Sequence, residues 1–177
     1  VLFVSIHQDP RTIYPGRGFA DDIGAGDGRG YTINIPMPRF SGNMQWKRAL
    51  DEIFVPVCAE FKPDAIIRNG GSDPFYADEL TELGLDLDGL AGVGKIVRSA
   101  SDKGPRKLLD LMVSGYGDFV PYGWLALFSG VTGLDVDYKK YARLVHPMPR
   151  RIPKETLDRQ TDAVIKEVKG NLAEFWS

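Results

Sequence analysis

Short apolar runs separate longer stretches in which apolar residues recur at helical spacing. The short runs are rich in β-branched and aliphatic residues and end at Gly, Pro or polar residues, so they predict β-strands. They cover residues 1–6, 31–35, 64–68 and 107–113. The first run, VLFVSI, is continuous rather than alternating, which predicts a strand buried on both faces of a parallel sheet.

The longer stretches predict helices. They cover residues 43–61, 88–101, 120–132 and 154–176. Asn43 is suited to cap the first helix, and Pro56 inside it should produce a kink because proline has no N–H to donate. Pro153 suits the first position of the last helix, and the Pro-rich segment 146–153 before it is predicted to be a stiff connector. Strands alternate with helices, so the sequence predicts one α/β domain over residues 1–177 with a mainly parallel sheet.

Composition narrows the classes of function. The chain has 177 residues, 43% of them hydrophobic, and a net charge of -2, which is the profile of one globular domain and gives no reason to expect direct nucleic-acid binding. No apolar run reaches the roughly 18 residues that a membrane span needs. The one cysteine, Cys58, lies among apolar residues, so we expect it in the core and expect a cytoplasmic location. The sequence is compatible with a monomer and with a homo-oligomer.

Candidate chemistry follows the predicted strands, because open α/β sheets bind ligands beyond the carboxyl ends of their strands. Asp73 comes after Gly70 and Gly71, which let the backbone approach closely where a carboxylate is offered, so Asp73 is a candidate metal ligand. Its alternative role is a turn or cap residue. Tyr116 lies between glycines after the fourth strand and is suited to point into a cleft, although it could also be a rim aromatic that packs by its ring.

The sequence does not hold a complete zinc or nucleotide site. Catalytic zinc usually takes three protein ligands, and the histidines of this chain are His7 and His146. The sequence has no HExxH motif, paired CxxC, P-loop or serine elbow. The glycine-rich segment 24–30 precedes a strand rather than a helix, so it has no helix N-terminus to bind phosphate.

The motifs VSIH, IYPG, GRGYTINIP, NGGSDPFYADEL and SGYG occur in this order along the chain. Together they resemble the C-terminal half of the histone deacetylase superfamily, which includes acetoin utilization proteins and acetylpolyamine amidohydrolases. The similarity runs over essentially all 177 residues. It implies an arginase-like fold, an open mainly parallel sheet flanked by helices, of which this chain would be the incomplete C-terminal portion. The opening strand-like run without a methionine agrees with that expectation.

The resemblance implies roles for residues of the candidate site. Asp73 would be a carboxylate ligand of the catalytic zinc, and Tyr116 the tyrosine that hydrogen-bonds the carbonyl oxygen of the acyl group. Tyr14 would form a wall of the acyl-lysine channel and Leu80 part of its rim, with Gly115 also at the substrate. The deacetylase would therefore bind its substrate along the loops that follow the strands.

Structural cations are also implied. Ser5, with the backbone carbonyl of Ile6, matches a potassium or sodium site, and Tyr31 matches a ligand position of a second one. His7 matches a structural rather than a catalytic position. These assignments come from the resemblance alone.

The resemblance also implies that important parts of the site lie outside this chain. The family's His-His pair and Asp-x-His zinc ligands precede the strand that begins at Val1, so we expect this chain to need an N-terminal half as partner and to be inactive alone. The substrate would be acyl-lysine, an acetylpolyamine or a similar amide. One alternative is an arginase-type ureohydrolase. That enzyme needs several aspartates to bind two manganese ions, and Asp73 has no second aspartate two residues away, which disfavours this alternative. Another is a non-catalytic interaction or structural domain.

Three positions depart from the usual pattern of the superfamily. Ser114 stands where the family usually has glycine, Ser72 replaces the aromatic or alanine before the ligand aspartate, and Pro74 follows that aspartate. The candidate ligand and phenol are unaffected. These departures bear on the width of the channel, and therefore on the substrate.

Overall fold

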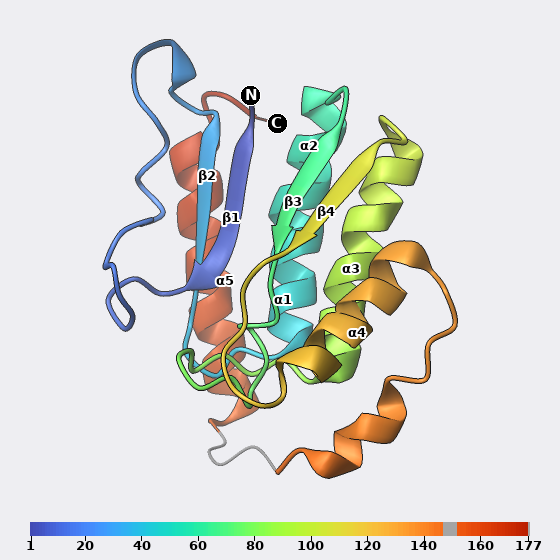
Figure 1. Cartoon of the computed structure of the whole chain (residues 1–177). Coiled ribbons are helices and arrows are strands. Elements are labelled where there is room, and N and C mark those ends of the chain that lie inside the picture. Colours follow the sequence, from blue (N-terminus) through green and yellow to red (C-terminus); the bar gives the residue numbers. More distant parts are fainter. Residues whose placement is uncertain (147–151, 177) are drawn as a thin grey trace.

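The strands form two parallel pairs with helices on one side (Figure 1). The computed structural model describes residues 1–146 and 152–176. The paired strands are β1 (Phe3–Gln8) with β2 (Thr32–Met37), and β3 (Ile66–Gly70) with β4 (Leu108–Met112). All four predicted strands are confirmed to within a few residues, and so is their parallel pairing.

The helices occupy the stretches that the hydrophobic periodicity predicts. They are α1 (Asn43–Ala49), the π-helical turn η2 (Leu50–Phe54), α2 (Val55–Phe61), α3 (Leu87–Lys103), α4 (Val120–Thr132) and α5 (Lys154–Leu172). Short 3₁₀ turns are η1 (Gly26–Gly28) and η3 (Lys139–Leu144). Within the described residues, no helix combines the length and apolarity that a bilayer crossing requires. The predicted connector 146–153 falls largely on residues 147–151, which lie outside the described part.

The helical stretch 43–61 differs from its prediction at two points. Its cap is Gly42 rather than Asn43, whose side chain instead pairs with Asp86, the cap of α3, and so joins the starts of two helices. The interruption is the π-helical turn η2, which ends two residues before Pro56. Because Pro56 cannot donate to the carbonyl one turn earlier, the helix widens there by one residue.

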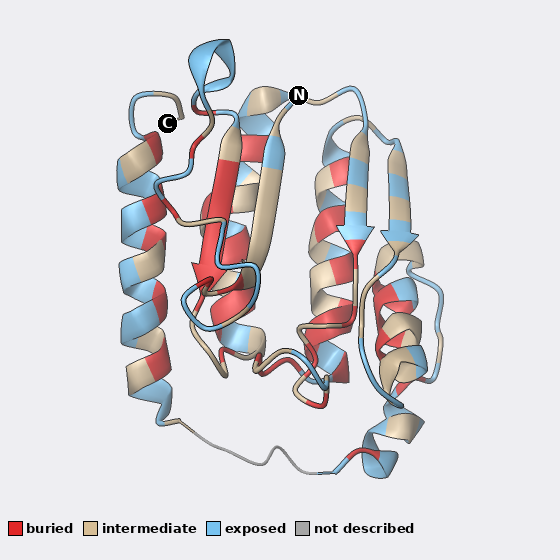
Figure 2. Ribbon diagram, turned by 60° about the vertical axis from the view of Figure 1, so that its left-hand side comes forward, coloured by how far each residue is buried: buried red, intermediate tan, exposed pale blue. Residues whose placement is uncertain are grey.

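One face of the strands is open, and this corrects the expectation that the first strand is buried on both faces. The helices cover only one side, and exposed positions alternate along β3 and β4 on the other (Figure 2). Phe3 in β1 is 55% exposed and Ile67 in β3 is 69% exposed, whereas Ile33 and Ile35 in β2 are buried completely. Strand β1 therefore has the apolar composition of a strand buried on both faces, but helices pack on only one of its faces.

An ion pair with little solvent exposure crosses between β3 and β4. Arg68 stands directly opposite Asp110, and its Nε and Nη2 donate to Asp110 Oδ2 at 2.9 and 2.6 Å. The side chains are 13% and 10% exposed. A Cβ at Gly70 would lie 2.6 Å from the guanidinium, so the pair also requires glycine at the end of β3.

Removing one member of this pair should destabilise the fold strongly. Asp110→Ala leaves a poorly solvated guanidinium without its partner, which should lower the free energy of unfolding by about 3–5 kcal/mol. The matched control is Asp51→Ala, because Asp51 pairs with Lys47 on an exposed helix face, where such pairs contribute about 0.5 kcal/mol or less. Urea unfolding of both variants measures the difference. Equal losses would contradict a structural role for the Arg68–Asp110 pair.

Candidate functional site

The candidate site lies on the two loops that follow β3 and β4. These strands are paired in register from Ile66 with Leu108 to Gly70 with Met112, so the two loops leave the sheet side by side. The pairing continues beyond the strands, where Ser72 N–H donates to the Ser114 carbonyl at 2.9 Å. As a result, Asp73 and Tyr116 follow one edge of the sheet, each within two residues of that hydrogen bond.

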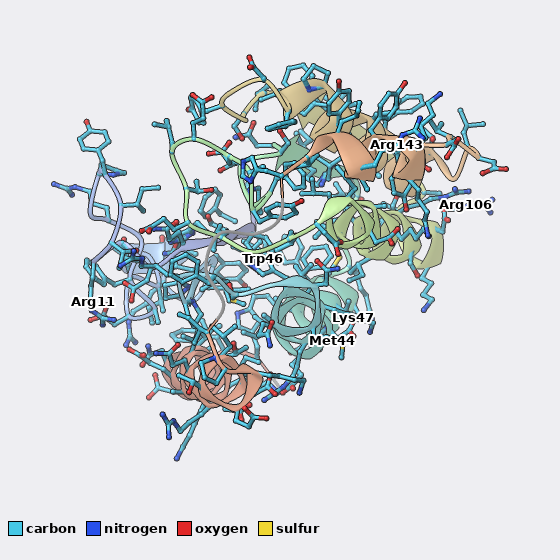
Figure 3. The ribbon with its side chains drawn as sticks, turned by 90° about the horizontal axis from the view of Figure 1, so that it is seen from below. Arg11, Met44, Trp46, Lys47, Arg106 and Arg143 are labelled. Carbon is cyan, nitrogen blue, oxygen red and sulfur yellow. The ribbon has the colours of Figure 1, made fainter. Side chains whose placement is uncertain are left out.

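Helix α4 anchors the second loop. Trp124 Nε1 donates to the same Ser114 carbonyl at 2.9 Å, so this oxygen accepts from the first loop and from the helix. Figure 3 looks onto the sheet edge that carries these loops, with Arg11 and Arg143 labelled on other segments. The position of Ser114 is therefore fixed by contacts with β3's loop and with α4.

Asp73 is a partly buried carboxylate. Burial raises the pKa of Asp73, a hydrogen bond from Ser114 Oγ to Oδ1 at 2.7 Å opposes this, and the charge of Asp78 raises the pKa further. A Cβ at Gly71 would overlap Ser114 Oγ and lie 2.5 Å from Asp73 Oδ1, so the close approach needs glycine. A carboxylate whose ionised form is disfavoured in this way is typical of a functional site, where a bound cation would reverse the balance.

Tyr116 has a fixed backbone and a projecting side chain. Its N–H donates to Asp78 Oδ2 at 2.7 Å, and its carbonyl accepts from Glu79 N–H at 3.3 Å. The flanking residues have φ of +134° at Gly115 and +97° at Gly117, which favour glycine. Since Tyr116 itself is 47% exposed, its phenol extends from a held backbone toward solvent.

The predicted channel residues lie on two different loops. Leu80 is exposed in the loop 78–81, which is hydrogen-bonded to the backbone of Tyr116, so it belongs with Asp73 and Gly115 in one cluster. Tyr14 lies instead in the loop after β1 and is 92% exposed. The structure therefore brings together Asp73, Leu80, Gly115 and Tyr116, but leaves Tyr14 apart on a neighbouring loop.

The predicted ligands of monovalent cations occupy β1 and the start of β2. Ser5 Oγ is 2.8 Å from His7 Nδ1, and His7 Nε2 is 2.9 Å from the Gly18 carbonyl. A carbonyl accepts only, so Nε2 carries the proton and Ser5 donates to Nδ1, which leaves the lone pairs of Ser5 Oγ for a cation. Ile6 is the intervening residue of the same strand. Both ring nitrogens of His7 serve the structure.

Tyr31 lies three positions away from Ser5 along the strand direction, because Ser5 is paired with Asn34. It precedes the amino end of β2, where its carbonyl accepts from Phe3 N–H at 2.9 Å and its ring meets Phe61 and Trp176 edge-on. Asp73, in contrast, follows the carboxyl end of β3. A cation at Tyr31 would consequently be a separate site from the one at Ser5, as the resemblance implies.

The described residues do not by themselves complete a zinc site. Across residues 1–146 and 152–176, no group of three or more His, Cys, Asp or Glu side chains is placed to hold a metal ion. Asp73 fits as one ligand, because its carboxylate is held by Ser114 and its ionised form needs positive charge. Catalytic zinc usually has three protein ligands, so further ligands are required.

Sequence reasoning did not single out several residues that shape this site. Asp78 and Thr81 bind the loop together, since Asp78 Oδ1 accepts from Thr81 N–H at 2.9 Å and the Thr81 hydroxyl donates to the Asp73 carbonyl. Ser114 stood out only as a departure from the usual glycine. One signal in the sequence could have identified Asp78. It precedes Leu80 by two residues and Thr81 by three, and this is the spacing at which an Asx turn binds backbone N–H groups.

Comparison with known proteins gives consistent relatives. Residues 1–130 match the histone deacetylase domain family. A probable deacetylase of Archaeoglobus fulgidus is 33% identical over 97% of this chain, which covers 46% of that protein. The acetylpolyamine amidohydrolase of Burkholderia pseudomallei is 36% identical over 55% of this chain, which covers 28% of that protein. The chain thus spans less than half the length of these relatives.

Solved structures give the same fold. The histone deacetylase Clr3 superposes with a TM-score of 0.78 at 25% identity, over 99% of this chain and 28% of that chain. An acetylpolyamine aminohydrolase from Burkholderia pseudomallei superposes with a TM-score of 0.65 at 29% identity, over 74% of this chain and 37% of that chain. These likenesses confirm the arginase-like α/β fold expected from the resemblance, with this chain as a part of the domain.

The structural role of His7 generates a prediction about pH. Burial lowers the pKa of His7 below its usual 6.5, so the unfolded chain binds a proton before the folded chain does as the pH falls. The stability from this group is present above about pH 6.5 and is lost as the pH falls toward the folded-state pKa. His7→Gln should therefore flatten the fall in unfolding free energy between about pH 7 and pH 5. An unchanged slope would contradict this, and His146→Gln, which leaves His7 intact, is the control.

Proposed function

The chain belongs to the histone deacetylase domain family, and we propose that it is the C-terminal part of a zinc-dependent amidohydrolase that removes an acyl group from acyl-lysine, an acetylpolyamine or a similar amide. The observation that carries this proposal is the pairing of Asp73 with the loop of Tyr116. A partly buried carboxylate with a raised pKa and a projecting phenol lie on two loops that are hydrogen-bonded to each other at one edge of a parallel sheet. This arrangement supports a metal ligand next to a group that binds a carbonyl oxygen.

The residues of this chain have distinct tasks in the proposed reaction. A zinc ion held by Asp73 and further ligands would supply a water of lowered pKa, toward about 7, and would polarise the amide carbonyl. Asp73 offers one carboxylate to the metal and is held in place by Ser114. The Tyr116 phenol donates a hydrogen bond to the acyl carbonyl oxygen, where negative charge develops as the amide is attacked.

A second part of the domain must supply what these residues lack. We propose that an N-terminal half, with a His-His pair and Asp-x-His ligands, provides the general base and the remaining zinc ligands. Its proposed docking surface is the open face of the strands, where Ile67, Leu109, Leu111 and Val113 are exposed. The strands also keep unpaired edges, because they form two separate two-stranded sheets. On this proposal the chain is inactive alone.

Monovalent cations are the remaining cofactors of the proposal. Ser5 and the Ile6 carbonyl would bind a structural potassium or sodium ion, which the available lone pairs of Ser5 Oγ support. Tyr31 would contribute its carbonyl to a second ion. Neither ion takes part in the proposed chemistry.

A non-catalytic interaction domain is the second candidate function. It is favoured by one observation, the lack of a three-residue metal cluster within the part of the chain that the structure describes. The two proposals differ in what precedes Val1 in the encoded protein. A segment with a His-His pair and an Asp-x-His motif there supports the enzyme, whereas a start codon at that point supports the interaction domain.

Substitution of Asp73 and Tyr116 separates metal binding from turnover. In the enzyme with both halves, Asp73→Ala should abolish zinc retention, because the site loses a charged ligand. Tyr116→Phe should keep the zinc and lower kcat about 10²–10³-fold, the usual loss on removing one oxyanion donor. Metal analysis and kinetics on an acetyl-lysine peptide and an acetylpolyamine measure both effects. Asp27→Ala, in an exposed turn, is the control. Full zinc content in Asp73→Ala would refute the ligand assignment.

Solution behaviour tests the proposed docking surface. The isolated chain should self-associate, or bind the N-terminal half tightly when both are expressed together, because aliphatic side chains and strand edges are open. Leu109→Lys combined with Leu111→Lys should weaken both associations, as seen by light scattering after size-exclusion chromatography. Leu134→Lys is the matched control, since Leu134 is an exposed leucine that follows α4 and is not part of a strand. The proposal is contradicted if the isolated chain is a stable monomer and does not bind the N-terminal half.

A further inference from the structure

The carboxylate of Asp78 binds N–H groups of its own loop and the N–H of Tyr116, which is 38 residues away. Its Oδ1 accepts from Leu80 N–H and Thr81 N–H, each at 2.9 Å. Its Oδ2 accepts from Tyr116 N–H at 2.7 Å. Both oxygens are thus engaged by backbone donors, so the geometry suits Asp78 to holding the chain rather than to binding a metal ion or abstracting a proton.

The segment around Tyr116 needs such a support. Gly115 and Gly117 have positive φ angles, and glycines on both sides give Tyr116 a backbone that is intrinsically mobile. Their lack of side chains is also what lets the two loops meet, since a Cβ at Gly117 would lie 2.6 Å from Glu79 Oε1. The conformation that directs the phenol must therefore be fixed from outside the segment.

Asp78 fixes it as part of a set of loop contacts. Glu79 N–H donates to the Tyr116 carbonyl at 3.3 Å, so both backbone groups of Tyr116 are held by consecutive residues. At the other end of the same loop, the Thr81 hydroxyl donates to the Asp73 carbonyl. The loop 73–81 is consequently tied to the proposed metal ligand at one end and to the proposed oxyanion donor at the other.

We propose that Asp78 is a positioning residue for the Tyr116 phenol, which it orients through the Tyr116 backbone N–H. This inference rests on the proposed function, because it assigns a role to Tyr116. The bond is charge-assisted, and bonds of this kind are roughly twice as strong as those between neutral groups. A side chain displaced by as little as about 1 Å loses much of its effect in a reaction that depends on aligned groups.

An isosteric change separates the two functions of this carboxylate. In Asp78→Asn, the amide oxygen still accepts from Leu80 and Thr81, while the amide nitrogen faces Tyr116 N–H as donor against donor. The local turn is kept and the bond to Tyr116 is lost. In the enzyme with both halves, Asp78→Asn should lower kcat about 10- to 100-fold, a smaller loss than removing an oxyanion donor outright. Its zinc content and KM should stay unchanged. Asp118→Asn, an exposed aspartate two residues beyond Tyr116, is the control and should keep full kcat.

A double substitution distinguishes positioning from a general structural role. If Asp78 acts through the phenol, Asp78→Asn has little further effect on kcat in a Tyr116→Phe enzyme. An equal loss of kcat in both backgrounds, or an unchanged kcat in the single variant, overturns the proposal. Hydrogen exchange gives a readout besides activity, because the Tyr116 amide should exchange faster in Asp78→Asn and not in Asp118→Asn. Unaltered exchange also overturns it.

The same experiments keep this inference separate from the proposed function. A Tyr116→Phe enzyme with full kcat would overturn the oxyanion role of Tyr116, and with it the catalytic consequence of Asp78. Faster exchange at the Tyr116 amide in Asp78→Asn would then show that only the support of the loop is real. A Tyr116→Phe enzyme with low kcat, together with an unaffected Asp78→Asn enzyme, overturns the positioning role alone.

Discussion

The candidate site depends on the parallel pairing of β3 with β4. The register that places Gly70 beside Met112 makes the two following loops start together, and the bond from Ser72 to the Ser114 carbonyl extends this register into the loops. A shift of one residue would turn every side chain of a strand to its other face. The Arg68–Asp110 pair, directly across the same two strands, disfavours such a shift because the shift would separate two charges that have little contact with solvent.

Small residues and hydroxyl groups convert that register into a site. Gly71 leaves room for Ser114 against Asp73, and the Ser114 hydroxyl partly compensates a carboxylate that burial makes reluctant to ionise. The usual glycine of the family at position 114 could not offer this bond. In the proposed enzyme, the serine therefore restrains a metal ligand in a way that a glycine backbone cannot, at the expense of space next to the metal.

Much of the fold was predictable from sequence because the signals are local. Continuous apolar runs gave the strands, helical periodicity gave the helices, and glycines around Asp73 and Tyr116 marked the loops that carry the candidate chemistry. The contact of Asp78 with Tyr116 was not predictable, since the N–H that it binds is 38 residues away, whereas its bonds to Leu80 and Thr81 have the spacing of an Asx turn. The exposure of Phe3 was missed for a related reason. An apolar strand indicates that both of its faces need to be buried, but it does not indicate which segment buries them.

The open sheet face and the raised pKa of Asp73 both support the second part of the domain that we propose. A carboxylate with a raised pKa destabilises the folded chain at neutral pH, because ionisation is easier after unfolding. Exposed aliphatic side chains on β3 and β4 likewise favour whatever removes them from water. A segment that covered this face and completed the metal site would relieve both penalties in one event, so zinc binding and association of the two parts should be thermodynamically coupled. In the proposed enzyme, each would therefore strengthen the other.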